Sequence, residues 1–189
     1  MARKIGILGG TFNPVHNAHL AIARAARDAF ELDEVLFMPS FEPPHVDAKE
    51  TLDHNQRVEM LELALCGESG FEIDLREIAR EGKSYTIDTI REMRAESYDE
   101  YYFIIGGDMI EYLPKWREID ELLRLVTFVG SVRPGYEVTN PCGIELFAAP
   151  ELEISSSEIR RRVIAGESID GLVPDKVKDF IYEHRLYNA

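Results

Sequence analysis

The sequence predicts an α/β protein built on a doubly wound parallel sheet. Short apolar runs, typical of buried parallel strands, alternate along the chain with helix-favouring stretches of roughly 10–15 residues. Two of these runs end in a glycine pair, Gly9-Gly10 and Gly106-Gly107. In doubly wound sheets, ligands bind at the carboxyl ends of the strands, near the point where the strand order reverses. The glycine pairs therefore mark the expected place of a site.

Six short apolar segments are predicted to be strands. The first runs from residue 4 to 8 and meets Gly9-Gly10, and the second, 34–38, is closed by Pro39. The other four are 71–74, 101–105, 126–132 and 144–148. The segment 101–105 is the clearest, because it is wholly aromatic and aliphatic and ends at a glycine pair.

Helices are predicted between and after these strands. They are 19–30, 53–66, 84–96, two short pieces within 110–125, 155–165 and 174–184. Asp53 is the expected cap of the second helix, Pro114 breaks the two short pieces, and Pro174 starts the last helix. The stretch 40–52 is predicted to be a long loop, and such loops inside compact domains are often functional.

The chain of 189 residues has the size of one domain. We expect a single domain over 1–189, with a C-terminal helical portion at about 155–189. At this size a folded chain buries roughly 70% of the surface that its unfolded form exposes, so no disulfide or metal is needed to hold it together.

Charge and composition exclude several classes of function. Lys and Arg number 21 and Asp and Glu 35, a formal net charge of −14, which argues against a general nucleic-acid binder. Cys66 and Cys142 make no disulfide framework or paired metal motif. No apolar run approaches the roughly 20 residues of a membrane span, and the chain enters a strand without room for a signal peptide. We expect a cytoplasmic protein with no nucleic-acid or membrane partner. The sequence is compatible with a homo-oligomer as well as with a monomer.

Two histidines follow the first strand and its glycines. The segment reads G-G-T-F-N-P-V-H-N-A-H, which is neither a dinucleotide fingerprint nor a Walker A loop. His16 and His19 are three residues apart at a helix start, so both imidazoles can face the free N–H groups and the positive end of the helix dipole. This combination predicts a phosphate site.

The histidines and the charged residues also have simpler interpretations than a phosphate site. A histidine at a helix start, taken alone, is more often a cap or surface residue. Zinc is disfavoured because two imidazoles lack a third ligand, so we expect no protein-bound metal. His54 and His184 are interpreted as surface or capping residues, and the charges of 74–80 as a solvated face.

A serine and arginine cluster opens the helix at 155–165. Ser155 or Ser156 with Glu158 approximates a capping box, and alone this suggests a capped helix with a solvated basic face. Three arginines follow in an otherwise acidic chain. Because successive helical residues diverge by about 100°, only one of them can face the helix N-terminus, and Arg160 has the right phase. The cluster predicts a second anion site.

These segments carry a resemblance that extends over nearly the whole chain. G-G-T-F-x-P-x-H-x-x-H and I-S-S-S-x-I-R resemble the two signatures of the nucleotidyltransferases related to class I aminoacyl-tRNA synthetases. The S-Y-T-x-D-T segment from Ser84 and the K-W pair at Lys115-Trp116 are more specific and resemble the bacterial nicotinate-nucleotide adenylyltransferases. The resemblance implies a Rossmann-like nucleotidyltransferase fold.

The resemblance also implies two substrates and their contacts. Catalysis would fall to His16, His19 and Arg160. The expected ATP contacts are Gly9, Gly10, Thr11, Phe12, His16, His19, Gly106, Asp108, Arg133, Ser155, Ser156, Ser157 and Arg160. The expected nicotinate mononucleotide contacts are Thr11, His45, Ser84, Tyr85, Thr86, Tyr112, Lys115 and Trp116.

Several of these assignments compete with plainer structural roles. Trp116 is the sole tryptophan and would ordinarily be core, but the resemblance implies that it stacks on the nicotinate ring. The helix start at Tyr85-Thr86 offers N–H groups to the nicotinate carboxylate. Asp108 is either a helix cap or a contact near the ribose or adenine, and Arg133 either a plain turn residue or an adenine-side contact.

The chain departs from the family pattern at a few positions. Ala18 stands where glycine is common, Asn13 where aspartate is frequent and Ser157 where threonine is frequent; each keeps the local chemistry. Val46 replaces the basic residue usual after Pro-Pro-His, which puts one phosphate contact in doubt, and the sequence does not say whether Lys49 supplies it.

The implied reaction is transfer of the adenylyl group of ATP to nicotinate mononucleotide, with release of pyrophosphate. Mg²⁺ is expected to arrive bound to ATP. Two rivals stay open: an adenylyltransferase for another phosphate, such as nicotinamide mononucleotide or phosphopantetheine, and a non-catalytic nucleotide-binding regulator on the same fold.

Overall fold

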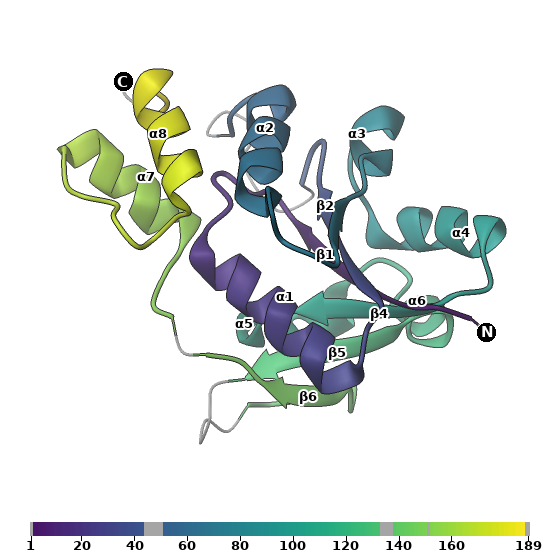
Figure 1. Cartoon of the computed structure of the whole chain (residues 1–189). Helices are drawn as coiled ribbons and strands as arrows, with labels where there is room; N and C mark the ends of the chain where they lie inside the picture. The colour runs from purple at the N-terminus through teal and green to yellow at the C-terminus, as the bar shows by residue number, and fades with distance from the viewer. Residues whose placement is uncertain (1, 44–50, 133–137, 151, 188–189) are drawn as a thin grey trace.

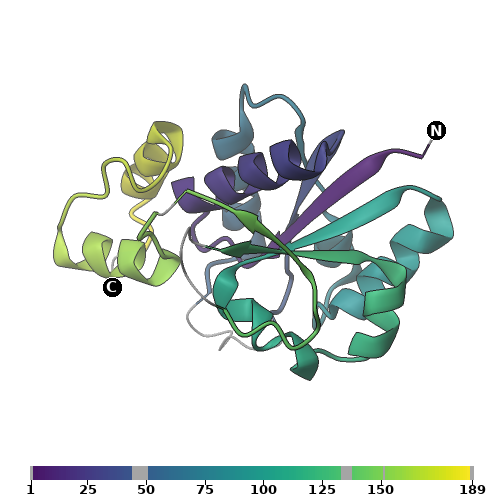
Figure 2. The same ribbon diagram turned by 90° about the horizontal axis from the view of Figure 1, so that it is seen from below.

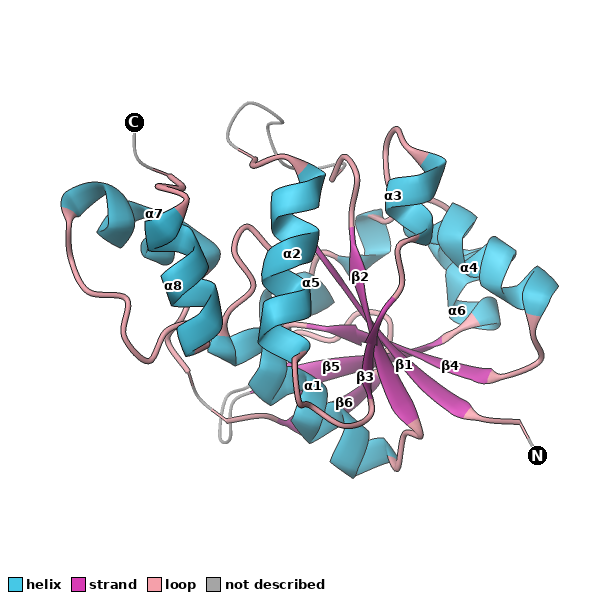
Figure 3. Ribbon diagram, turned by 45° about the horizontal axis from the view of Figure 1, so that its top comes forward, coloured by secondary structure: helices cyan, strands magenta, loops and turns pink. Residues whose placement is uncertain are grey.

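The computed structural model describes residues 2–43, 51–132, 138–150 and 152–187. In this part of the chain a six-stranded, all-parallel sheet has the order β3-β2-β1-β4-β5-β6. Its strands are β1 (Lys4–Gly10), β2 (Glu34–Pro39), β3 (Phe71–Ile73), β4 (Glu100–Ile105), β5 (Thr127–Val132) and β6 (Glu145–Ala148). The strands fan out with a strong twist (Figure 3). The order reverses between β1 and β4, which confirms the doubly wound sheet.

Helices cover both faces of the sheet. On one face lie α1 (Asn17–Phe30) and α2 (His54–Leu65); on the other lie α4 (Thr86–Glu96), α5 (Gly107–Ile110) and α6 (Ile119–Leu125) (Figure 2). The short α3 (Arg76–Arg80) precedes α4, and a 3₁₀ turn at Leu113–Lys115 separates α5 from α6. The last two helices, α7 (Ser156–Ala165) and α8 (Asp175–Glu183), lie together beside α1 and α2 (Figure 1). No helix in the described ranges is long and apolar enough to cross a bilayer.

Two hydrophobic clusters make up the core, one between the sheet and the helices on each of its faces. Leu20 of α1, Met60 of α2, Ile159 of α7 and Val177 of α8 belong to one cluster, which includes residues of the sheet. The C-terminal helices therefore share a core with the first two helices. On the other face, α4, α5 and α6 contribute Ile90, Ile110 and Leu122 to the second cluster. Burying side chains of this size stabilises the fold by roughly 1.5–3 kcal/mol each.

Most element boundaries follow the sequence signals. The Asp53 carboxylate accepts a hydrogen bond from Asn55 N at 2.9 Å and caps α2 as predicted. Ser155 caps α7, and Gly166 ends it with a positive φ of 69°, a left-handed conformation that favours glycine. Pro114 lies inside the 3₁₀ turn instead of at a simple break, and Pro174 is the residue before α8 instead of its first residue.

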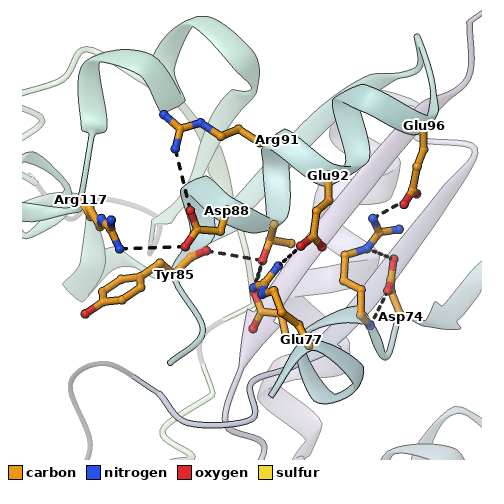
Figure 4. Close-up of polar contacts among 11 residues, drawn as sticks. Asp74, Glu77, Tyr85, Asp88, Arg91, Glu92, Glu96 and Arg117 are labelled. Carbon is orange, nitrogen blue, oxygen red and sulfur yellow. Dashed lines mark hydrogen bonds and ion pairs between the residues drawn. The ribbon is translucent and has the colours of Figure 1, made fainter. Parts of the chain in front are cut away.

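The prediction that 74–80 is merely a solvated face is wrong. These residues include α3, and its Glu77 is only 8% exposed. Thr89 of α4 donates its hydroxyl to Glu77 Oε1 at 2.7 Å, and Figure 4 shows Glu77 among the polar side chains that join α3 to α4. Burial raises the pKa of Glu77. The charged residues of this segment therefore tie two helices together.

Candidate active site

A cavity of about 1050 Å³ opens at the carboxyl ends of β1 and β4, where the strand order reverses. Its walls come from the ends of β1, β2 and β4, the starts of α1 and α4, and the segment 115–117. The predicted site residues among its lining are Gly9, Gly10, Thr11, His16, His19, Ser84, Tyr85, Thr86, Gly106, Asp108, Lys115 and Trp116. Residues far apart in the sequence thus meet at one place.

The glycines at the strand ends are required for different reasons. A Cβ on Gly10 would lie 3.1 Å from the ring of Phe12, and one on Gly9 would lie 3.3 Å from Phe103. These two glycines make room for aromatic rings of the protein, and both also line the cavity. A Cβ on Gly106 would meet nothing within 4 Å, so at this third glycine the missing side chain leaves open space.

The two histidines form a stacked pair in the first turn of α1. His16 is the residue before the helix, earlier than the predicted start, and is only 6% exposed. Its backbone N–H donates to Nδ1 of His19 at 3.1 Å, and the two ring centroids are 3.6 Å apart. The ring of Phe12, itself buried and outside the cavity lining, contacts His19 edge-on at 5.0 Å. Both imidazoles are held in fixed orientations.

The environment keeps both imidazoles neutral at pH 7. Burial lowers the pKa of His16 to about 4. It lowers the pKa of His19 well below its usual value, and the neighbouring His16 adds to the effect. Because His19 Nδ1 accepts a hydrogen bond, the proton of the neutral ring is on Nε2. His19 therefore offers an N–H donor beside the positive end of a helix dipole, a suitable contact for a phosphate oxygen.

The N-terminus of α7 is attached to the loop that carries this pair. Ser156 donates its hydroxyl to Pro14 O at 2.9 Å, and Arg160 Nη1 donates to Asn13 O at 2.9 Å. Ile154, just before the helix, lines the cavity. The predicted residues Ser155, Ser156, Ser157 and Arg160 are outside the cavity lining and lie next to its edge.

The helical phase predicted for the three arginines is confirmed. Arg160 turns toward the loop of residues 11–16 between β1 and α1, where the sequence predicts a phosphate site and which is called the phosphate loop below. Its Nη2 also reaches Ser157 Oγ at 3.5 Å. Arg161 and Arg162 turn away and pair with Glu158 on the exposed face of α7, each at 2.8 Å. These two arginines form the solvated basic face that the simpler interpretation assigned to all three.

The opposite wall of the cavity is formed by the start of α4. Ser84 is 7% exposed, and its hydroxyl accepts a hydrogen bond from Phe41 N at 3.0 Å. Tyr85 precedes the helix and provides no side-chain cap, and its backbone O accepts the Asp88 N–H at 3.1 Å. The N–H groups of Thr86 and Ile87 have no acceptor among the described residues, so these two keep their donor capacity. The Arg117 guanidinium lies 4.7 Å from the Tyr85 ring, and Figure 4 shows the two side chains together beside Asp88.

Trp116 packs against the core and also borders the cavity. Its ring packs edge-to-face on Phe103 and Phe128, with centroids 5.7 and 5.8 Å away, and also lines the cavity. Its buried Nε1 has no hydrogen-bond partner among the residues that the structure describes. Tyr112 does not line the cavity; its ring lies 4.9 Å from Nζ of Lys115, which does.

The remaining predicted residues are placed as follows. Asp108 lines the cavity in the first turn of α5, and because Gly106 is the residue before that helix, Asp108 is not its cap. His45 and Arg133 lie outside the described residues. Within the described ranges, no three His, Cys, Asp or Glu side chains are grouped as a metal site.

Several residues at or near the site were missed in the sequence, among them Arg117, which lines the cavity beside Tyr85. Arg57 is buried in the first turn of α2, and Glu77 lines the cavity. The Tyr187 hydroxyl donates to Asn13 Oδ1 at 3.0 Å, so the end of the chain contacts the phosphate loop. Of these residues, only Arg57 could have been found from the sequence. It lies on the same face of the predicted helix as Met60 and other apolar residues, and a charged residue on an apolar face indicates a buried charge.

Comparisons with known proteins agree with this fold and identify the family. A family model described as cytidylyltransferase-like matches residues 7–162, which defines the class as a nucleotidyltransferase. Two curated relatives are each 49% identical and bear the name "Probable nicotinate-nucleotide adenylyltransferase". The one from Listeria monocytogenes serotype 4b (strain F2365) aligns over 99% of this chain and 98% of its own length. The one from Geobacillus kaustophilus (strain HTA426) aligns over 98% and 87%. The chain belongs to the nicotinate-nucleotide adenylyltransferases of the cytidylyltransferase-like family.

The fold is also similar to a solved structure. "Plasmodium falciparum nicotinic acid mononucleotide adenylyltransferase complexed with NaAD" superposes with a TM-score of 0.81 at 20% identity. The match covers 98% of this chain and 97% of the Plasmodium chain. At this identity the likeness concerns the fold.

Proposed function

We propose that this chain transfers the adenylyl group of ATP to nicotinate mononucleotide, giving nicotinate adenine dinucleotide and pyrophosphate in NAD biosynthesis. The observation that carries the proposal is the cavity itself, which joins the His16–His19 pair on one wall to Trp116 and the start of α4 on the other. One wall offers donors for phosphates and the other an aromatic face with helix N–H groups. The family membership supports the same reaction.

The reaction needs no nucleophile from the protein. A phosphate oxygen of the mononucleotide attacks the α-phosphorus of ATP in line, and the bond from that phosphorus to the oxygen bridging to the β-phosphate breaks. The displaced electron pair leaves on pyrophosphate. Catalysis then consists of positioning and charge stabilisation. His19 Nε2–H and the start of α1 would hold α- and β-phosphate oxygens as charge moves to the leaving group.

The start of α7 is assigned to the end of the triphosphate. Its capped serines and Arg160 would hold the β- and γ-phosphates, since a helix N-terminus and a guanidinium both favour anions. Magnesium enters in this account as part of MgATP, keeping several water ligands beside the phosphates.

The nicotinate end is assigned to the opposite wall. The exposed face of Trp116 would stack on the pyridine ring, and the N–H groups at the start of α4 would donate to its carboxylate. Arg117 beside Tyr85 also lines this wall, but Asp88 and Glu118 lie within ion-pair distance, at 4.0 and 3.6 Å, and offset its charge. The preference for the acid over the neutral amide therefore rests on the N–H groups at the start of α4.

We further place the reaction in the cytoplasm. Cys66 and Cys142 are free thiols, as expected in a reducing compartment. Self-association remains a prediction. The edge strand β6, where Leu146 is 43% exposed, is the place where a second copy of the chain would pack. Light scattering of the purified protein would measure its mass in solution.

Pyrophosphate release tests the proposed function. Purified protein and MgATP are combined with nicotinate mononucleotide, nicotinamide mononucleotide or phosphopantetheine, and with no acceptor. The proposal expects release with nicotinate mononucleotide in equal amount to the dinucleotide formed. Binding of ATP without release for any acceptor would favour the regulator, and release with phosphopantetheine alone would favour the other adenylyltransferase.

A further inference from the structure

A buried cation stands behind the active-site cavity. Arg57, in the first turn of α2, is 1% exposed. Its Nε donates to Leu52 O at 3.1 Å and its Nη1 to Thr11 O at 2.8 Å. Its Nη2 donates to Ser40 O at 2.8 Å and Phe41 O at 3.3 Å. One planar group thus joins three separate segments of chain.

The electrostatics of this arrangement are unusual for a residue that only fills the core. Burial lowers the pKa of Arg57, and Asp53 partly offsets that effect. No carboxylate lies within ion-pair distance of Arg57 in the described part of the chain, so backbone carbonyl dipoles balance its charge. An apolar residue of similar volume would leave these carbonyls without a donor, and each buried polar group left unpaired destabilises the fold. Arg57 therefore links the segments through hydrogen bonds, which a residue that only fills space does not do.

The segments that Arg57 joins form two different walls of the cavity. Thr11 follows the glycine pair and leads to His16, on the triphosphate side. Ser40 directly follows β2 and precedes Phe41, whose N–H donates to the Ser84 hydroxyl on the mononucleotide side. Arg57 itself does not line the cavity. The two segments also contact each other directly, because Ser40 N–H donates to Gly10 O at 3.0 Å. The guanidinium can act on the substrates only by orienting the residues that follow this bond on each side, through Thr11 O and Ser40 O.

We propose that Arg57 is a positioning residue for adenylyl transfer, which holds the Thr11 and Ser40 turns in the orientation that brings the two substrate phosphates into line. The inference rests on the proposed function. Each substrate keeps its own wall when Arg57 is replaced, so binding should change little. The alignment between the substrates should suffer, because a misplacement of about 1 Å can lower a rate by 10²-fold. The signature is a loss of kcat with nearly constant KM.

Two substitutions separate positioning from packing. Arg57→Met fills a similar volume but leaves the backbone carbonyls that Arg57 contacts without a donor, so its Tm should fall, and its kinetics are measured well below that Tm. Arg57→Lys keeps the charge but lacks the planar fork that reaches three segments. We expect kcat to fall about 10²-fold in Arg57→Met and at least 10-fold in Arg57→Lys, with both KM values within about 3-fold of the wild type.

The chain provides a matched control. Arg94 also donates to backbone carbonyls, those of Leu125 at 2.7 Å and Asp99 at 2.6 Å. These acceptors precede β5 and β4, at the end of the sheet opposite the cavity. Arg94→Met therefore removes a similar set of hydrogen bonds away from the site, and its kcat should stay within about 3-fold of the wild type when assayed well below its Tm.

The outcomes divide clearly. A folded Arg57→Met enzyme with wild-type kcat, or an Arg94→Met enzyme with the same loss of kcat, would show that Arg57 is only a structural link. If Arg57→Met does not fold, the kcat and KM of Arg57→Lys decide by the same criterion, and failure of both variants to fold contradicts the inference. A wild-type protein that releases no pyrophosphate contradicts the proposed function, and the inference with it.

Discussion

The backbone N–H of His16 donates to Nδ1 of His19 at 3.1 Å, and this bond fixes the tautomer of the second imidazole. The proton of neutral His19 is thereby on Nε2. The same bond satisfies an N–H group at the start of α1, so it has both a structural and a chemical consequence.

His19→Gln separates these two consequences. Glutamine at this position of a helix can accept the same N–H as in a capping box, but it lacks the imidazole Nε2–H. We expect kcat to fall at least about 10²-fold, the typical effect of losing one preorganised donor to a developing charge. Urea unfolding should show little loss of stability, whereas His19→Ala should lose the cap as well, at about 1 kcal/mol. Near-wild-type turnover of His19→Gln would remove His19 from the mechanism.

Arg160→Ala should impair the use of ATP far more than Arg161→Ala or Arg162→Ala. Arg160 contacts the phosphate loop through Asn13 O, while the other two pair with Glu158 on the exposed face. We expect kcat/KM for ATP to fall at least 10-fold in Arg160→Ala and to change less than about 3-fold in the other two, since exposed ion pairs contribute little. Equal effects in all three variants would contradict the assignment.

His16 should make the fold sensitive to mild acid. Its pKa is about 4 in the folded protein, against about 6.5 in an unfolded chain. Between these values the unfolded chain binds more protons, so the free energy of unfolding falls as the pH drops from 6.5 toward 4. Between pH 7 and 4.5 the wild type should lose about 2 kcal/mol more than His16→Asn, which keeps a helix-capping residue. Urea unfolding of both proteins at each pH measures this, and equal losses would contradict the buried neutral imidazole.

Trp116→Leu should weaken the mononucleotide without changing the preference between acid and amide. Loss of stacking on a nucleobase typically costs about 1–3 kcal/mol, so KM should rise at least about 5-fold for both mononucleotides. Their ratio should stay within about 3-fold, because an aromatic face does not distinguish a carboxylate from an amide. Trp116→Phe is the control that keeps an aromatic face against Phe103 and Phe128. If the ratio between the two mononucleotides changes strongly in Trp116→Leu but not in Trp116→Phe, the aromatic face itself discriminates acid from amide, which contradicts this prediction.

Local signals in the sequence explain what could be predicted. Alternating strands and helices predicted the doubly wound sheet, and the glycine pairs marked its site because strand ends are local features. The 100° helical phase singled out Arg160, because a phase depends only on spacing within one helix. The S-Y-T-x-D-T and K-W motifs predicted that the start of α4 and Trp116 belong to one site, and both line the same cavity.

Long-range pairing explains what could not be predicted. The acceptors of Arg57 lie in a loop and at a strand end, and only the folded sheet brings them together. Glu77 looked like a surface charge because its partner Thr89 is on the next helix. Tyr187 contacts Asn13, which is 174 residues away in the sequence, and the periodicity of a segment cannot predict a contact between such distant residues.

The preference between the two pyridine mononucleotides is the sharpest test of the assigned substrate. Nicotinate mononucleotide has a carboxylate where the nicotinamide form has an amide. N–H groups at the start of α4 can donate to both oxygens of the carboxylate, whereas an amide would set its own NH₂ against one of those donors. Sites built to hydrogen-bond a group can reject an analogue by 10⁴-fold or more, and we expect a ratio of kcat/KM of at least about 10² in favour of the acid. Equal kcat/KM values for the two mononucleotides would contradict the carboxylate pocket at α4 and the assignment of the substrate.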